Sequence, residues 1–218
     1  MKKKPVLYLI LGIALLAAIG GGYSFWYQGH YFIKSEDSRI TGDIYRVMPR
    51  ISAKMTSLQV AEGDTVISDQ IVGQQDNTNL STSLLDQAAL RSPISGTVIK
   101  TMAKAGEVVS PGQTIAMVVN KKDLYISANI EEGDIHRVSV GQTVEFTVDT
   151  FSGSTLVGKV KEIGEATAAT FSLLPATNTS GNFTKVTQRI PIKISIDDQQ
   201  GLPLAPGMST TIKIHLKG

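Results

Sequence analysis

The residues that could do chemistry in this sequence are few and lie apart. The chain of 218 residues has no cysteine, which excludes a thiolate metal site, a cysteine nucleophile and a disulfide framework. Its three histidines, His30, His136 and His215, do not have the spacing of metal ligands. Gly158-Lys159 follows no phosphate-binding loop, and no catalytic triad or carboxylate pair stands out. We therefore predict a protein that is not an enzyme and holds no metal or cofactor.

One acidic cluster, formed by Glu131, Glu132 and Asp134, has the residue types of a cation site. The same residues suit the first turn of a short helix over residues 131–137, because carboxylates stabilise the positive end of the helix dipole. We favour the helix start over the cation site.

Charge and hydropathy predict a membrane segment at the N-terminus. Residues 5–33 contain no Asp, Glu, Lys or Arg, and the strongly apolar part covers residues 6–27. That length is close to the ~20 residues that a helix needs to cross a bilayer. Lys2–Lys4 precede it and aromatic residues crowd its far end, as at membrane interfaces. We predict an uncleaved single-pass anchor with a cytoplasmic N-terminus; a cleaved signal peptide is the alternative.

Beyond the anchor the charge is nearly balanced. Lys2–Lys4 are three of the 21 Lys and Arg, and the 19 Asp and Glu nearly cancel the others. The chain therefore lacks the basic surplus of a nucleic-acid-binding protein, and we expect no nucleic-acid partner.

Strand patterns dominate the remaining sequence. Apolar and polar residues alternate over 124–130, 144–149, 190–197 and 211–217, which predicts strands with one buried face. Only residues 81–90 and 131–137 favour helix. The fold class is therefore predicted as mainly β.

A repeat appears when the chain is shifted by 43 residues, because residues 51–72 then align with residues 94–115 without gaps. In each half, the residue pattern predicts a strand, a turn at a Gly-acidic pair, and a second strand. Gly63 and Gly106 supply the positive φ that such turns require. Each half exposes an apolar face, so we expect the two halves to pack face to face in a flattened sandwich.

The paired halves resemble those of a biotinyl/lipoyl domain. In that family, a carrier domain needs a modifiable lysine at the hairpin tip between the halves. No lysine occurs between Met55 and Ile99, and Lys54-Met55 lies inside the first strand of the first half. We therefore do not expect a swinging-arm carrier.

The order of anchor, two lipoyl halves and a β-rich segment resembles the HlyD-like membrane fusion proteins, also called periplasmic adaptors. The likeness is strongest to their EmrA-like multidrug-export branch, and it covers nearly the whole chain from Lys34. It rests on SRITGDIYRVMPRISAKMTSLQVAEGDTV (38–66), RSPISGTVIKTMAKAGEVVSPGQTIAMVV (91–119), LYISANIEEGDIHRVSVGQTVEFTVD (124–149) and LVGKVKEIGEATAATFSLLPATNTSGNFTKVTQRIPIKI (156–194).

The sequence departs from this family between the halves. Family members normally insert a long α-helical hairpin there, whose tip reaches toward an outer-membrane channel. Here only residues 73–90 separate the halves. The hairpin is missing, so the resemblance gives little reason to expect contact with an outer-membrane channel.

The resemblance implies a domain order. We expect a cytoplasmic tail and anchor at 1–33, a linker or strand leading into the ectodomain at 34–46, a lipoyl-like β-sandwich at 47–120, and a C-terminal β-barrel domain at 121–218. The sandwich is expected to comprise the halves 47–72 and 91–120, joined by the short linker 73–90.

The long polar segment 171–186 carries apolar residues and is a candidate partner interface, since loops of that length are usually functional or disordered. It could equally fold back on its own barrel. Gln188 and Arg189 could pair across an interface or simply begin a surface strand. The candidate interface residues are Phe171, Leu173, Leu174, Pro175, Asn182, Phe183, Gln188 and Arg189.

The function implied by the resemblance is that of an adaptor subunit of an efflux or secretion system in the bacterial cell (inner) membrane. Its implied partner is an integral-membrane exporter, most naturally of the major-facilitator class, and self-association into a homo-oligomer is also implied. The alternatives are an adaptor of an ATP-driven exporter and a membrane-anchored scaffold or ligand-binding module without a transport role.

Overall fold

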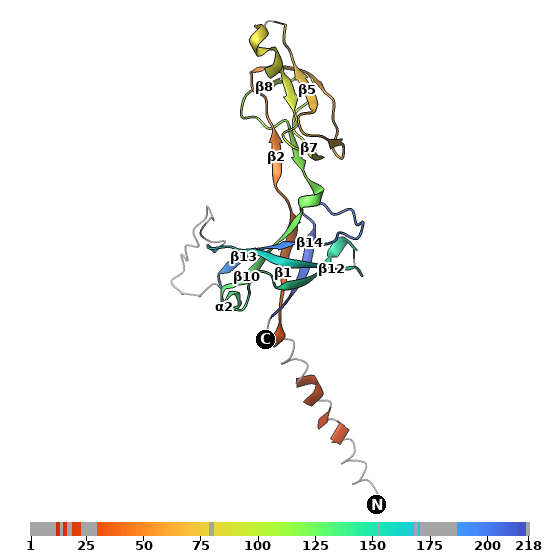
Figure 1. Ribbon diagram of the computed structural model, residues 1–218, viewed down its shortest axis with the longest axis vertical. Helices are drawn as coiled ribbons and strands as arrows, with labels where there is room; N and C mark the ends of the chain where they lie inside the picture. The colour runs from red at the N-terminus through yellow and green to blue at the C-terminus, as the bar shows by residue number, and fades with distance from the viewer. Residues whose placement is uncertain are drawn as a thin grey trace, which may run out of the picture. The chain divides into compact units, whose positions relative to one another are not determined.

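The computed structural model describes residues 12–13, 15–16, 19–22, 30–78, 81–151, 153–167, 170 and 187–216, without the side chains of 82–84. The chain divides into two compact units (Figure 1). The first, here called the barrel unit, comprises residues 1–39, 126–202 and 208–218, and the second, the lipoyl-like unit, comprises residues 40–125 and 203–207. Among the described residues, no helix has the length and apolar character needed to cross a membrane. The predicted anchor at 6–27 falls largely outside them.

The prediction of a mainly β fold is confirmed. The elements of the lipoyl-like unit are β2 (Ile44–Val47), β3 (Ala53–Leu58), β4 (Thr65–Val66), β5 (Ile71–Gln75), the 3-10 helix η1 (Thr82–Ala88), β6 (Ala89–Arg91), β7 (Gly96–Thr101), β8 (Val108–Val109), β9 (Ala116–Val119) and η2 (Lys121–Asp123). The elements of the barrel unit are β1 (Phe32–Thr41), β10 (Tyr125–Glu131), α2 (Glu132–Ile135), β11 (Thr143–Val148), η3 (Asp149–Phe151), β12 (Thr155–Ile163), β13 (Arg189–Ser195) and β14 (Ser209–His215). In this division, the last two residues of β1 and the first residue of β10 are assigned to the lipoyl-like unit.

Six strands close the barrel in the order β1-β10-β13-β12-β11-β14. The alternating residues of the predicted strands supply its interior: Val144, Phe146 and Val148 of β11 are each at most 1% exposed. Ile192 and Ile194 of β13 are equally buried. Closure gives each of these six described strands a neighbour on both sides, whereas an open sheet would expose two unpaired edges.

The first barrel strand comes from the stretch that the sequence predicts as a lead-in at 34–46. β1 pairs antiparallel with β14, from Phe32 opposite His215 to Arg39 opposite Ser209. Without β1, both β14 and β10 would have unpaired edges in the barrel order. The barrel is therefore not confined to residues 121–218, because its closing strand precedes the lipoyl-like unit in the chain.

The 43-residue repeat is visible strand by strand in the lipoyl-like unit. Shifting β3 by 43 residues gives the bounds of β7, and shifting β4 gives the bounds of β8. Gly63 and Gly106 have φ values of 96° and 97°, as the turn prediction requires.

The predicted sandwich built from the two halves is confirmed, but the halves exchange strands instead of forming one sheet each. One sheet has the order β2-β9-β7-β4 and the other β6-β5-β3-β8, and each contains strands from both halves. The backbone N–H of Gly63 donates to the carbonyl of Val98 at 2.8 Å, and that of Gly106 donates to the carbonyl of Met55 at 2.7 Å. The same hydrogen bond is thus made twice, once in each direction, about an approximate two-fold axis.

The core of this unit obeys the same symmetry. It consists largely of buried apolar residues that lie 43 positions apart in pairs. These pairs are Val47 and Leu90, Met55 and Val98, Val60 and Ala103, Val66 and Val109, and Val72 and Ile115. Neither half can bury its apolar residues alone, so the unit should fold only when both halves are present.

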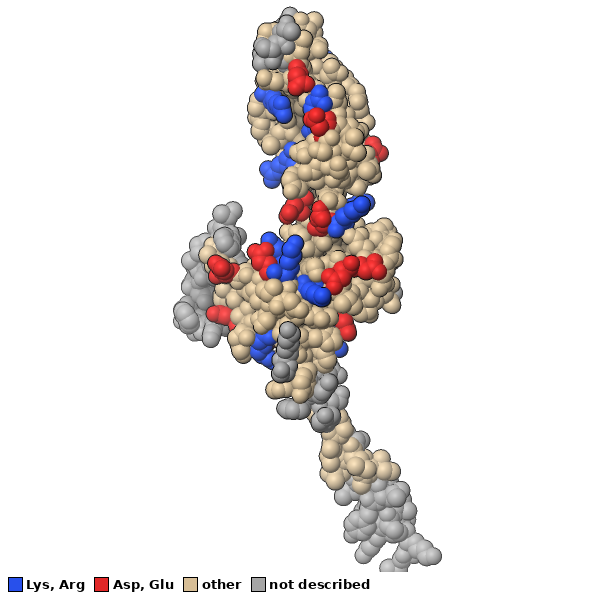
Figure 2. Space-filling view, in the orientation of Figure 1, with Lys and Arg blue, Asp and Glu red and all other residues tan. Residues whose placement is uncertain are grey.

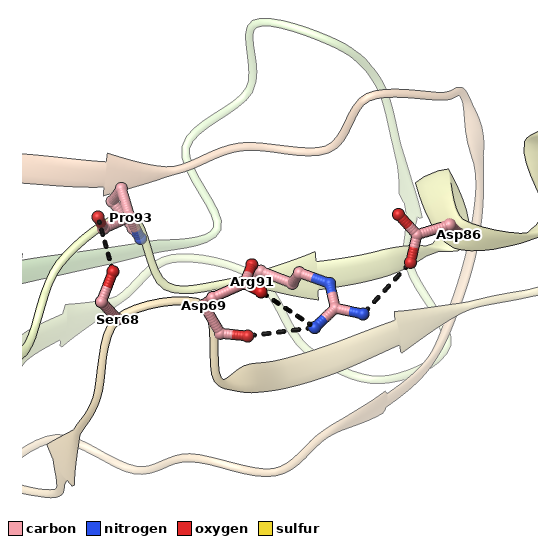
Figure 3. A network of polar contacts seen from close by, with 5 residues as sticks. All are labelled: Ser68, Asp69, Asp86, Arg91 and Pro93. Carbon is pink, nitrogen blue, oxygen red and sulfur yellow. Dashed lines mark hydrogen bonds and ion pairs between the residues drawn. The ribbon is translucent and has the colours of Figure 1, made fainter.

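The linker between the halves differs from its prediction. Residues 81–90 favour helix in the sequence, whereas the structure has the 3-10 helix η1 followed by β6, in which Leu90 pairs with Gly73 of β5. Burial of Leu90 in the core outweighs its helix propensity. The side chain of Arg91 in β6 links η1 to the residues before β5 (Figure 3). Its guanidinium donates to the carbonyl of Asp69 at 3.0 Å and to the carboxylate of Asp86 at 3.1 Å.

Candidate functional site

The candidate interface predicted from the sequence lies between β12 and β13 in the chain or at the start of β13. The backbone N–H of Gly164, just after β12, donates to the carbonyl of Pro191 in β13 at 2.8 Å. The two ends of the intervening stretch are therefore held close together on the barrel. Six of the predicted interface residues lie outside the described residues: Phe171, Leu173, Leu174, Pro175, Asn182 and Phe183.

The two described members of that set make contacts inside the barrel unit. The carbonyl of Gln188 accepts a hydrogen bond from the backbone N–H of Glu132 at 2.9 Å, which ties the start of β13 to α2. The guanidinium of Arg189 forms an ion pair with the carboxylate of Asp37 in β1 at 2.5 Å. Arg189 thus has an intramolecular partner, which accounts for it without a second protein.

Asp37 is the centre of a polar link across three neighbouring strands. Its carboxylate accepts hydrogen bonds from Arg189 of β13 and, at 3.1 Å, from the side-chain amide of Asn129 of β10. The hydroxyl of Ser35 in β1 donates to the backbone carbonyl of Asn129 at 2.9 Å. Partial burial by itself would raise the pKa of Asp37, but the hydrogen bonds from Arg189 and Asn129 outweigh it and hold that pKa below its usual value.

A groove of about 570 Å³ opens beside this link. Its charged lining residues are Lys34, Glu36, Asp37, Glu131, Asp134 and Arg189. Four of these six are acidic, so the groove is mildly negative. Figure 2 shows acidic and basic side chains side by side on the visible face, which fits the balanced charge expected from the sequence.

The acidic cluster at 131–134 behaves as the start of a helix. Glu132 and Asp134 lie in the first turn of α2, and the carboxylate of Asp134 pairs with Arg137 at 3.3 Å. Among the described residues, no group of three or more His, Asp and Glu side chains is arranged to hold a metal ion. The arrangement at this end of the barrel therefore offers charge pairs and a surface groove.

Sequence reasoning missed Asp37 and Asn129. Neither residue belongs to a motif, and the link depends on β1, β10 and β13 being neighbours in a barrel whose strand order is not sequential. Arg189 is the only one of the three that the sequence singles out.

The ion pair gives a pH-dependent prediction. The folded-state pKa of Asp37 lies below its unfolded value, so its stabilisation is complete above that unfolded value and is lost as the pH falls through the folded pKa. Arg189→Gln should lower the free energy of unfolding by at most about 1 kcal/mol near neutral pH, since the pair is partly exposed. Urea denaturation of wild type and variant should show this difference shrinking as the pH falls below the unfolded-state pKa of Asp37.

The matched control is Lys193→Gln, which removes one positive charge from the same strand and breaks a more exposed pair with Glu162. A destabilisation by Arg189→Gln that stays constant down to acidic pH would contradict the assignment to Asp37.

Comparison with known proteins assigns both units. Residues 43–121 match the family described as RND MFP, barrel-sandwich hybrid domain, and residues 123–215 match the AAEA-like beta-barrel domain. YhbJ of Bacillus subtilis (strain 168) is 37% identical over 210 residues, which cover 96% of this chain and 91% of YhbJ. The chain belongs to the EmrA-like membrane fusion proteins. The two family matches together span residues 43–215 of this chain.

Other relatives are longer than this chain. The multidrug export protein EmrA of Escherichia coli (strain K12) is 33% identical over 156 residues, which cover 69% of this chain and 40% of EmrA. The chain thus spans less than half the length of EmrA. Between β5 and β6 it has only residues 76–88, so this membrane fusion protein lacks the helical hairpin.

A solved structure shows the same fold at low sequence identity. MacA from Actinobacillus actinomycetemcomitans superposes with a TM-score of 0.67 at 19% identity, covering 86% of this chain and 79% of MacA. This likeness supports the fold of the two units.

Proposed function

We propose that this membrane fusion protein is the membrane-anchored adaptor of an efflux system and that it partners an integral-membrane exporter. The observation that carries the proposal is the match to YhbJ, whose name places it with efflux systems, over 96% of the chain. EmrA of Escherichia coli is named as a multidrug export protein. The resemblance to the EmrA-like branch favours an exporter of the major-facilitator class.

The role proposed for the chain is structural, without a catalytic step or a bound cofactor. The apolar segment at 6–27 would hold the chain in the bacterial cell membrane, with the N-terminus in the cytoplasm and both β units outside it. Supporting this, the described side chains of Ile13, Leu15, Leu16 and Ile19 are 61–71% exposed, as suits contact with lipid. A homo-oligomer is proposed from the family resemblance.

The exporter contact is proposed for the segment at 171–186 and its attachment on the barrel. Three features support this location. The segment is long and carries apolar residues. Gly164 and Pro191, described residues on either side of it in the chain, are joined by a hydrogen bond, and a mildly acidic groove lies beside Arg189. Contact with an outer-membrane channel is not proposed, because the linker at 76–88 is too short to form a long hairpin.

Replacing the two aromatic residues in this segment by serine tests the proposed contact with the exporter. Phe171→Ser combined with Phe183→Ser should lower co-purification of the exporter at least about tenfold, because aromatic anchors dominate the energy of most protein interfaces. The measurement is the exporter-to-adaptor ratio after mild solubilisation of membranes that contain the full-length chain.

The control is Val140→Ser, which replaces an apolar side chain elsewhere on the barrel unit. The side chain of Val140 is 62% exposed. Its exporter ratio should equal that of wild type, and all three proteins should have the same circular dichroism. Equal recovery of the exporter with the double variant would remove the segment from the interface.

A further inference from the structure

A second groove lies where the chain enters the barrel. It has a volume of about 410 Å³ and lies within the barrel unit. Two hydrogen bonds build it: the guanidinium of Arg137 donates to the carbonyl of His30 at 2.6 Å, and the backbone N–H of Leu216 donates to the carbonyl of Tyr31 at 2.9 Å. The residues just before β1 are thereby held against both the α2 region and the end of β14.

The lining of this groove has the chemistry of a phosphate site with an apolar margin. Its polar side chains are those of Arg137, His30, His136, Ser139 and Gln142, and none of the lining residues is acidic. Arginine is well suited to phosphate because its planar guanidinium can donate two parallel hydrogen bonds. The remaining lining residues are Tyr31 and Leu216, whose carbon surface suits the region below a lipid headgroup.

The guanidinium of Arg137 also forms an ion pair with the carboxylate of Asp134 at 3.3 Å, which balances part of the positive charge of Arg137. Asp134 lines the other groove and is absent from the lining of this one. The Arg137 side chain is 28% exposed and is one of the residues that line the groove.

The position of the groove in the chain fits a membrane surface. His30 follows Tyr27, the last residue of the apolar segment, by three residues, and three peptide units span at most about 11 Å. The headgroup layer of a bilayer is roughly 5–8 Å thick on each side. If the segment crosses the membrane, the covalent chain keeps His30 at or just above the headgroups.

We infer that this groove binds the phosphate headgroup of an anionic membrane phospholipid. Arg137 contacts the phosphate, the two imidazoles and Ser139 donate around it, and Tyr31 and Leu216 contact the glycerol region. Binding would fix the barrel at the membrane surface. The inference rests on the membrane anchoring in the proposed function.

The test uses the full-length chain in nanodiscs that contain equal amounts of phosphatidylcholine and phosphatidylglycerol. Native mass spectrometry after release from the nanodiscs measures which lipid remains bound. Wild type should retain phosphatidylglycerol over phosphatidylcholine by about fivefold, the effect expected of one basic residue at an anionic surface. Arg137→Gln should remove this preference, whereas Lys159→Gln, on the exposed surface of β12, should keep it.

Because Arg137→Gln also removes hydrogen bonds that hold the fold, a second variant is needed. His30→Gln with His136→Gln leaves the Arg137 contacts to Asp134 and to the His30 carbonyl in place, and it should reduce the lipid preference. Equal retention of both lipids by wild type, or an unchanged preference in both groove variants, would overturn the inference. Alkaline extraction of native membranes tests the anchoring separately, since a chain that stays in the membrane without lipid preference refutes only the headgroup site.

Discussion

Gly158→Ala is expected to destabilise the barrel by about 3 kcal/mol, near the upper end of overpacking effects. A Cβ atom at Gly158 would lie 1.8 Å from the carbonyl oxygen of Ser195 and 3.0 Å from its carbonyl carbon. Both atoms belong to the backbone of β13, so no side-chain rotation can relieve the clash. Strands β12 and β13 would have to separate, although the backbone N–H of Lys159 bonds the Ser195 hydroxyl at 3.1 Å.

Peptide-resolved hydrogen exchange on the full-length chain can show where the stability lost in Gly158→Ala is located. Peptides of β12 and β13 should lose protection in Gly158→Ala, while those of the lipoyl-like unit keep theirs. Gly133→Ala is the control, because a Cβ at Gly133 meets no atom within 4 Å. Wild-type protection in Gly158→Ala would show that the close approach of the two strands is not as described.

The second large effect is expected in the lipoyl-like unit. Leu90 is 1% exposed, and truncation of such a residue to alanine costs about 3 kcal/mol. Leu90 lies in β6, at the end of the linker and directly before the second half, and its strand pairs with β5 of the first half. Leu90→Ala should therefore lower the protection of strands from both halves together.

Leu85→Ala provides the matched control, since Leu85 lies in η1 and is 42% exposed. Its effect on the free energy of unfolding should stay within about 0.5 kcal/mol. If Leu90→Ala lowered protection only in the second half, the strand exchange between the halves would be contradicted.

The repeat explains why so much of the lipoyl-like unit could be predicted. The Gly-acidic pairs located both turns, and the alignment of residues 51–72 with 94–115 reproduced the bounds of two strand pairs. The exchange of strands between the halves could not be predicted, because alternation indicates which face of a strand is buried but not which strand lies beside it.

β1 shows where alternation fails. Its buried residues include Ser38, which is 6% exposed and bonds the Thr210 hydroxyl at 2.8 Å. The strand also has an irregular register between Ser35 and Ser38. A buried polar residue and a bulge disrupt the period-two pattern, so the sequence indicated only a lead-in where the barrel has its closing strand.

The candidate site was predicted less completely than the fold. Arg189 was singled out as a candidate interface residue, but its observed partner Asp37 lies 152 positions earlier in the chain. Contacts of that separation depend on barrel closure, which local patterns do not encode.

The adaptor role is tested most directly by photo-crosslinking the full-length chain in its native membrane. A crosslinker at Phe171 or Phe183, followed by pull-down and identification of the attached protein, should yield an integral-membrane exporter. The same crosslinker at Ile67, an exposed position in the lipoyl-like unit, serves as the comparison and should not yield it. If no crosslinker position yields a transporter together with the adaptor, the adaptor role is contradicted.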